Sequence, residues 1–190
     1  KVKNREVWLQ IKMEENMSIL ANYLAQLIKA QLNGEKPVSV PEEIQVEDLI
    51  HLSCKNHMEY LVMGALLKTD GISEEIQGIL RSHVMRSIVR TTTQIMDLKE
   101  IIRRFEEKKI VNQPMKGAQM KFIYPSPEMR EMSDIDILIR YDCMDRAAEE
   151  LKDMGYVLEQ AIKHHDIYVK EPFMVVEAHR AMYDKTVDNN

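Results

Sequence analysis

The residues most able to do chemistry are two aspartates, Asp134 and Asp136, inside the β-branched apolar run 132–140. Such a run predicts a β-strand. Because strand side chains alternate between faces, the two carboxylates are expected on one face while Ile135 and Ile137 enter a core. Hard divalent ions such as Mg²⁺ favour oxygen ligands, so the pair suggests metal-assisted phosphoryl chemistry. On this pattern alone, a surface strand that carries two acids by chance is the commoner explanation.

A third acid, Glu177, interrupts the apolar run 173–179 and shares one strand face with His179. An unpaired charge in so apolar a strand is costly. Two explanations stay open: an edge strand or a salt bridge to Arg180 or Lys121, and a position beside the aspartates on a neighbouring strand. In the second case three carboxylates would hold two cations about 3.5–4 Å apart, and the third acid would accept a proton.

Lys116 and Gly117 lie where a strand is expected to pass into a helix. Glycine permits a close backbone approach, and a helix N-terminus offers N–H donors to a phosphate, to which Lys116 would add a charge. A plain turn explains the same pair without any ligand. Arg130 would neutralise phosphate charge, although an arginine that caps the turn before a strand explains it equally well.

Composition limits the classes of protein that fit. The 190 residues suit one domain with an appendage or two small domains. The net charge of −5, without a basic block, argues against an extended nucleic-acid surface. Cys54 and Cys143 lack C-x-x-C spacing, so we expect reduced thiols in a cytoplasmic protein, and neither a disulfide framework nor a zinc site. No apolar stretch approaches the length of a membrane span.

The first part of the chain, residues 1–109, is expected to be a helical region. Apolar residues recur there at three- and four-residue intervals, and Ser73 is a candidate N-cap for the longest helix. Four helices are expected, over residues 17–31, from 41 to about 52, over 57–69 and over 74–109. Their apolar faces are expected to pack on each other or across a homo-oligomer interface.

The pattern changes at residue 110, where short apolar runs begin to alternate with turns and helices. Strands are expected from 110, over 132–140, 156–158, 167–169 and 173–179, and helices over 115–124 and 144–154. We therefore expect an α+β fold in which a helical region precedes a sheet flanked by helices over 110–190. Because the sequence starts without Met and ends abruptly, we expect it to be a fragment of a longer protein.

These motifs occur in an order that resembles a known family. The set is Lys116-Gly117, Tyr124-Pro125, Arg130, residues 133–139, Gly155-Tyr156, His164-His165 and residues 176–179. It resembles the largely uncharacterised bacterial nucleotidyltransferase family of the polymerase-β-like nucleotidyltransferase superfamily. The resemblance covers residues 110–183 closely and implies a nucleotidyltransferase-type mixed β-sheet.

The resemblance also implies residue roles. Asp134 and Asp136 correspond to the paired acids that bind two Mg²⁺ ions and the nucleotide phosphates. Glu177 corresponds to the third acid, which completes the metal site and deprotonates the acceptor hydroxyl. His164 and His165 would approach the substrate, although tandem histidines in a strand more often place one in the core and one in solvent.

The phosphate-binding turn departs from the pattern of the superfamily. Lys116 and Gly117 lie where the superfamily has a Gly-Ser or Gly-Gly turn that holds the phosphates, and Arg130 is the further candidate for nucleotide binding. Ala118 follows Gly117, so this position offers no hydroxyl to a terminal phosphate. The departure leaves the strength of nucleotide binding open.

The resemblance implies an enzyme that transfers NMP from an NTP, which we expect to be ATP, to a hydroxyl of an acceptor that the sequence does not identify. Mg²⁺ would assist the in-line attack, and pyrophosphate would leave. One alternative is a catalytically idle nucleotide-binding or regulatory module that acts through its helical region. Another is a helical scaffold whose acids hold a structural ion. A Mg²⁺-dependent nuclease fits less well because the chain is acidic.

Overall fold

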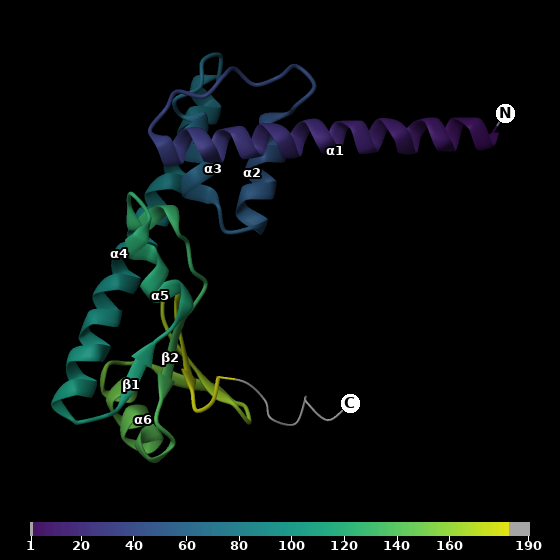
Figure 1. Ribbon diagram of the computed structural model, residues 1–190. Coiled ribbons are helices and arrows are strands. Elements are labelled where there is room, and N and C mark those ends of the chain that lie inside the picture. The colour runs from purple at the N-terminus through teal and green to yellow at the C-terminus, as the bar shows by residue number, and fades with distance from the viewer. Residues whose placement is uncertain (1, 183–190) are drawn as a thin grey trace. The chain divides into compact units, whose positions relative to one another are not determined.

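The structure, a computed structural model, describes residues 2–182, with side chains from Met17 onward (Figure 1). The chain divides into two compact units, which meet between Ile88 and Val89. Helix α4 (Glu74–Glu107) passes from the first unit into the second. The division therefore lies inside a helix, whereas the sequence suggested a division after residue 109. None of the described helices is long and apolar enough to cross a membrane.

The first unit is helical and consists of α1 (Val2–Asn33), α2 (Val46–Lys55), α3 (Glu59–Leu66) and the beginning of α4. Apolar side chains from all four helices form its core: Tyr23, Leu27, Leu49, Val62, Met63, Leu66 and Leu80. The apolar face of α1 that the sequence indicated is therefore buried within its own unit, at least from Tyr23 to Leu27.

Local backbone geometry shortens two of the expected helices in this unit. The N–H of Ile44 donates to the carbonyl of Pro41 over 3.0 Å in a turn, so α2 begins only at Val46. The left-handed conformation of His57, with φ of 53°, separates α2 from α3. The N-cap predicted at Ser73 is confirmed, because its Oγ accepts the N–H of Ile76 at 3.3 Å.

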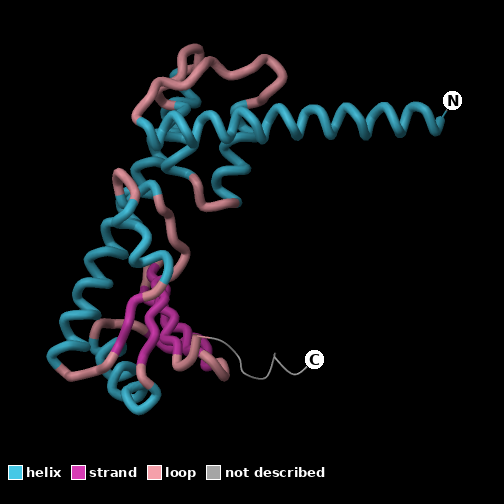
Figure 2. The backbone as a smooth tube through the Cα atoms, in the orientation of Figure 1, coloured by secondary structure: helices cyan, strands magenta, loops and turns pink. Residues whose placement is uncertain are grey.

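The second unit contains a five-stranded sheet, drawn in magenta in Figure 2. Its strands are β1 (Asn112–Pro114), β2 (Ile135–Ile139), β3 (Val157–Ala161), β4 (His165–Lys170) and β5 (Met174–His179), in the order β1-β2-β5-β4-β3. Strands β2 and β5 are parallel, and all the other neighbours are antiparallel. The sheet is therefore mixed.

One face of the sheet is buried by helices. Ile135, Ile137 and Ile139 alternate along β2 and are almost wholly buried. They share a core with side chains of α4 and of α6 (Met144–Asp153), among them Leu98, Ile101, Phe105, Ala147 and Leu151. Burial of each such side chain contributes about 1.5–3 kcal/mol. The expected α+β fold, with a mixed sheet flanked by helices after a helical region, is confirmed.

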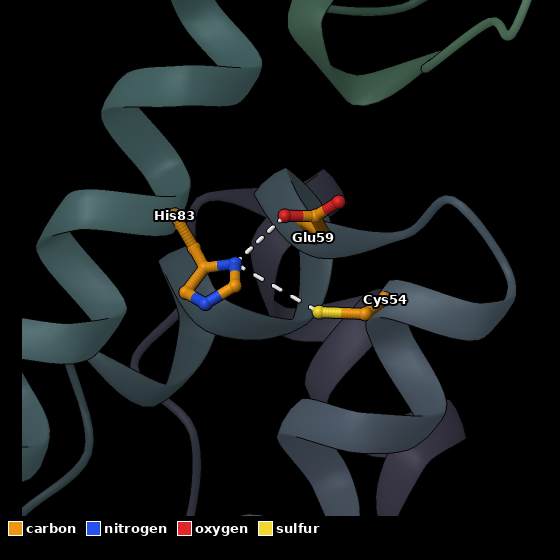
Figure 3. A group of neighbouring side chains, drawn as sticks. All are labelled: Cys54, Glu59 and His83. Carbon is orange, nitrogen blue, oxygen red and sulfur yellow. Dashed lines mark hydrogen bonds and ion pairs between the residues drawn. The ribbon is translucent and has the colours of Figure 1, made fainter.

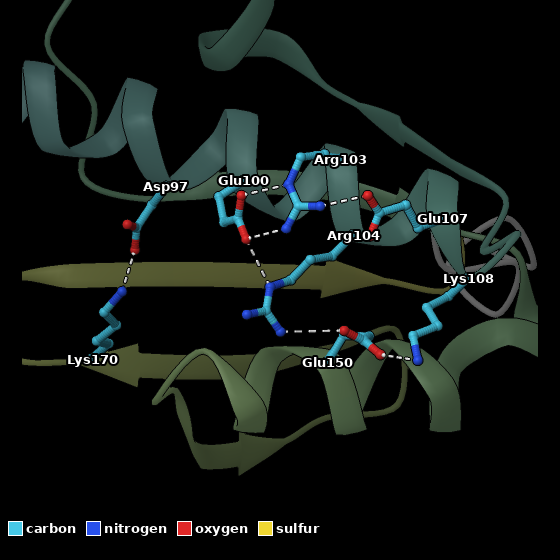
Figure 4. Close-up of polar contacts among 8 residues, drawn as sticks. All are labelled: Asp97, Glu100, Arg103, Arg104, Glu107, Lys108, Glu150 and Lys170. Carbon is cyan, nitrogen blue, oxygen red and sulfur yellow. Dashed lines mark hydrogen bonds and ion pairs between the residues drawn. The ribbon is translucent and has the colours of Figure 1, made fainter.

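Ion pairs join the same helices to each other and to the sheet (Figure 4). Glu150 of α6 lies 3.4 Å from Arg104 and 3.5 Å from Lys108. Asp97 of α4 lies 2.8 Å from the Nζ of Lys170 on β4. Partly exposed pairs such as these add little stability.

Three element boundaries in the second unit differ from the sequence prediction. The strand expected from residue 110 begins at Asn112, because Lys109, which follows the end of α4 at Glu107, has a φ of 53° and the N–H of Ile110 bonds back to the carbonyl of Phe105. The helix expected over 115–124 is the short α5 (Lys116–Met120) with a 3₁₀ turn after it. The acidic strand is shorter than expected, so Asp134 precedes it.

Candidate functional site

Two of the three candidate acids lie side by side on the sheet face opposite the isoleucines. Asp136 of β2 and Glu177 of β5 are partners in the register of these parallel strands. Each alternates with buried apolar neighbours, and the two side chains stay 13% and 23% exposed. Of the two explanations for Glu177, the geometry therefore favours a position beside the aspartate strand.

A histidine joins these two carboxylates. The Nε2 of His179 lies 2.8 Å from Oδ1 of Asp136 and 3.3 Å from Oε2 of Glu177. His165 of β4 stands opposite His179 in the register, and its Nε2 is 3.8 Å from the same Glu177 oxygen. The two imidazole rings are 4.8 Å apart. Four side chains from three strands thus form one cluster on this face.

Sequence reasoning noticed that His179 shares the face of Glu177 but missed its bond to Asp136. The alternation of buried and exposed residues along β5 was the available signal, because it already pointed His179 toward any acid on the next strand. The contact of His165 depends on the β4–β5 register, which the sequence does not reveal. His164 precedes β4, and its carbonyl accepts the N–H of Arg180 at 2.9 Å.

Asp134 is half-buried and lies one residue before β2. Within the part of the chain that the structure describes, its carboxylate makes no hydrogen bond or ion pair. The structure thus joins Asp136 to Glu177 through His179, and places Asp134 next to this cluster in sequence without a contact to it.

The predicted phosphate-binding turn adjoins Asp136. The N–H of Met115 donates to the Asp136 carbonyl at 2.9 Å, and Nζ of Lys116 lies 3.9 Å from the Asp136 carboxylate. Lys116 has a φ of 36°, which is rare for a residue with a side chain. Gly117 packs closely, since a Cβ there would lie 2.8 Å from the Met132 sulfur. Close packing is therefore one reason for the glycine.

The contacts of Arg130 resemble those of an arginine that caps the turn before a strand. Its Nη1 donates to the carbonyl of Glu131 at 2.7 Å, and its own carbonyl accepts a bond from Nζ of Lys121 at 2.7 Å. These bonds hold the segment before β2. They do not connect Arg130 to the acidic cluster.

The predicted salt bridge from Glu177 to Arg180 or Lys121 is wrong. Arg180 pairs with Asp166 at 2.5 Å, and Nζ of Lys121 is held by Thr91 and the Arg130 carbonyl. Lys121 is 1% exposed, and burial lowers its pKa to about 8. Neither cation is therefore the partner of Glu177.

The donor set fits a divalent cation. Carboxylate oxygens suit Mg²⁺, and imidazoles also suit Mn²⁺ or Zn²⁺. The ligand atoms of His165, Glu177 and His179 all lie within 4.8 Å of one another. Nε2 of His179 lies between the two carboxylates, whose negative charges would attract a cation at this position.

Comparison with known proteins gives one family and one similar solved structure. The model of a family described as an uncharacterised nucleotidyltransferase matches residues 42–190. The solution structure of the antibiotic-resistance factor ANT(2'')-Ia is similar at 12% identity and a TM-score of 0.42. That match covers 50% of this chain and 50% of the other chain, so the chain spans about half the length of that structure. The comparison with curated proteins found no match.

Proposed function

The chain belongs to the uncharacterised nucleotidyltransferase family, and from this premise we propose that it is a Mg²⁺-dependent enzyme that transfers NMP from an NTP to an acceptor hydroxyl and releases pyrophosphate. We propose ATP as the NTP. The observation that carries the proposal is the pairing of Asp136 with Glu177 on adjacent strands, on the sheet face that the helices leave accessible. We also propose a cytoplasmic location, because two cysteines without C-x-x-C spacing are the pattern expected of reduced thiols.

In this proposal Asp134, Asp136 and Glu177 hold two Mg²⁺ ions. The ions would neutralise charge on the attacking and leaving oxygens of the transferred phosphoryl group. The sheet supports the arrangement because the buried alternate residues of β2 and β5 fix the direction of the acids. Rigid positioning of this kind supplies much of the rate in phosphoryl transfer.

In the proposed reaction, side chains of the chain itself accept the released proton and supply positive charge to the phosphates. The oxygen of the acceptor hydroxyl attacks the α-phosphorus, and the bond from that phosphorus to the pyrophosphate oxygen breaks. Glu177 accepts the proton that the hydroxyl loses. Lys116, whose side chain is 75% exposed beside Asp136, supplies positive charge to the phosphates from the β1–α5 turn.

The missing hydroxyl at residue 118 is one of two features that favour the alternative of an idle nucleotide-binding module; the other is the abrupt end of the sequence. Ala118 is 2% exposed and belongs to the core beneath the sheet. An alanine is the residue expected for packing at such a position, so its presence is not a sign of a degenerate site. This weakens the case for the idle module.

The test is transfer of label from α-labelled NTPs in the presence of Mg²⁺ to a broad panel of acceptors. The variant Asp134→Asn/Asp136→Asn should lower the rate at least about 10²-fold, the scale seen when groups that stabilise transition-state charge are removed. Asp142→Asn is the matched control, because Asp142 lies just beyond the same strand, pairs with Arg140 and is 64% exposed. It should transfer label at the rate of the unaltered chain.

Two results would count against the enzyme. One is no transfer from any common NTP to any acceptor, and the other is equal transfer by the double variant. Calorimetry then separates the alternatives, because nucleotide binding without turnover identifies the idle module. A structural ion would instead raise the melting temperature with Mg²⁺ in the absence of nucleotide binding.

A further inference from the structure

A second group of metal-ligating side chains lies in the helical first unit (Figure 3). Cys54 comes from α2, Glu59 is the first residue of α3 and His83 comes from α4. Nδ1 of His83 lies 2.8 Å from Oε2 of Glu59 and 3.8 Å from Sγ of Cys54. We propose that these residues bind a transition-metal ion, with Zn²⁺ preferred, and that the ion links the three helices.

The orientation of the imidazole argues against a catalytic thiol. In a nucleophile–base–acid triad, the base uses one ring nitrogen for the nucleophile and the other for the acid. In this cluster the thiol and the carboxylate both meet Nδ1 of His83, as Figure 3 shows. The ring therefore cannot pass a proton from Cys54 to Glu59. Three donors that converge on one point are instead the arrangement that a metal ion requires.

The separations of the donor atoms suit tetrahedral zinc. With Zn–S of about 2.3 Å and Zn–N and Zn–O of about 2.0–2.2 Å, tetrahedral geometry places S and N about 3.5 Å apart and N and O about 3.4 Å apart. The observed values of 3.8 and 2.8 Å need only small side-chain movements to reach these distances. All three donor atoms lie within 4.8 Å of one another.

The chemistry of the donors selects the class of metal. A thiolate and an imidazole favour Zn²⁺ over Mg²⁺ or Ca²⁺, which prefer sets of oxygen ligands. The side chains of His83 and Glu59 are 19% and 17% exposed, so water can reach the cluster and supply a fourth ligand. Binding would deprotonate the thiol and release a proton.

The sequence argued against a zinc site on the ground that the cysteines lack a C-x-x-C motif. The ligands proposed here are 5 and 24 residues apart along the chain and come from three helices, so no short motif marks them. Packing of the helical core brings them together, since Cys54 and Val84, the neighbour of His83, both pack against it.

The experiment is a titration of the metal-free full chain with Co²⁺ and then with Zn²⁺. Co²⁺ bound to a thiolate gives a charge-transfer band in the near ultraviolet, which separates this cluster from the cysteine-free cluster of His165 and His179. One equivalent of Co²⁺ should produce the band, and Zn²⁺ should abolish it by displacement. Zn²⁺ should also raise the melting temperature.

Variants identify the ligands. Cys54→Ser should lose the band, and His83→Gln should weaken Zn²⁺ binding by more than the about 10–100-fold that loss of a second-shell partner costs. The matched controls Cys143→Ser and His51→Gln should keep both the band and the affinity. Far-ultraviolet circular dichroism checks that each variant is folded. The proposal is overturned if the unaltered chain gives no band, or if folded Cys54→Ser keeps it.

Discussion

Lys121 carries a charge inside the core of the second unit, and its replacement by methionine is expected to change how stability depends on pH. The side chain is 1% exposed, and Nζ is held by the Thr91 hydroxyl at 3.3 Å and the Arg130 carbonyl at 2.7 Å. Burial lowers its pKa from 10.5 to about 8, although the nearby Glu131 carboxylate opposes this shift. The folded chain therefore releases this proton at lower pH than the unfolded chain does.

The sign and size of the effect follow from proton linkage. Below about pH 8 both states keep the proton, so burial of the charge costs the most there. Between about pH 8 and 10.5 the unfolded chain holds a proton that the folded chain lacks, so the free energy of unfolding rises with pH. The slope is about 1.4 kcal/mol per pH unit. Over this range, the free energy of unfolding should therefore rise by about 3 kcal/mol more for the unaltered chain than for Lys121→Met.

Urea unfolding, followed by circular dichroism at several pH values from about 7 to 10.5, measures this difference. The helical first unit is the same in both proteins and cancels in the comparison. Lys152→Met is the control, because Lys152 is exposed on α6, and its curve should run parallel to that of the unaltered chain. Parallel curves for Lys121→Met as well would refute the reasoning, since the lysine would then not lose its proton in the folded state.

Two further substitutions test packing and a buried hydrogen bond, both by urea unfolding. Gly64→Ala should lower the free energy of unfolding by about 1–2 kcal/mol, because its Cβ would lie 2.8 Å from Nε2 of the buried Gln31. Gly78→Ala should instead raise that free energy by about 0.5–1 kcal/mol, because the space around Gly78 is open and alanine favours a helix more than glycine does. Tyr156→Phe should cost about 1–2 kcal/mol, because the Tyr156 hydroxyl donates to Asp97 over 2.8 Å, and Asp97 keeps its lysine partner; an unchanged midpoint would contradict this.

The sequence was sufficient to predict the elements whose periodicity comes from burial. Ile135, Ile137 and Ile139 alternate because one face of β2 packs on helices, and the same alternation on β5 placed Glu177 and His179 together. Some turns were harder to foresee, because two of the left-handed conformations that follow helices fall on His57 and Lys109, whereas others fall on glycines such as Gly34 and Gly155.

The sequence indicated candidate residues of the site, but it did not give the strand register that decides their contacts. An acid within an apolar strand signals a special environment, and this argument led to Glu177. The sequence does not say which residues stand opposite each other, so the contacts of His165 and His179 needed the structure. The cluster of Cys54, Glu59 and His83 was missed for the same reason, since it depends on how three helices pack.

The topology of the sheet explains why the acids share an accessible face. Parallel strands require a crossover connection, and between β2 and β5 the chain runs through α6 and the β3–β4 hairpin. The crossover helix buries the isoleucine face together with α4, while the hairpin joins the far edge of β5 within the sheet. The connection between the parallel strands β2 and β5 therefore covers only the isoleucine face of the sheet. The opposite face carries Asp136 and Glu177 in register, and their side chains there stay 13% and 23% exposed.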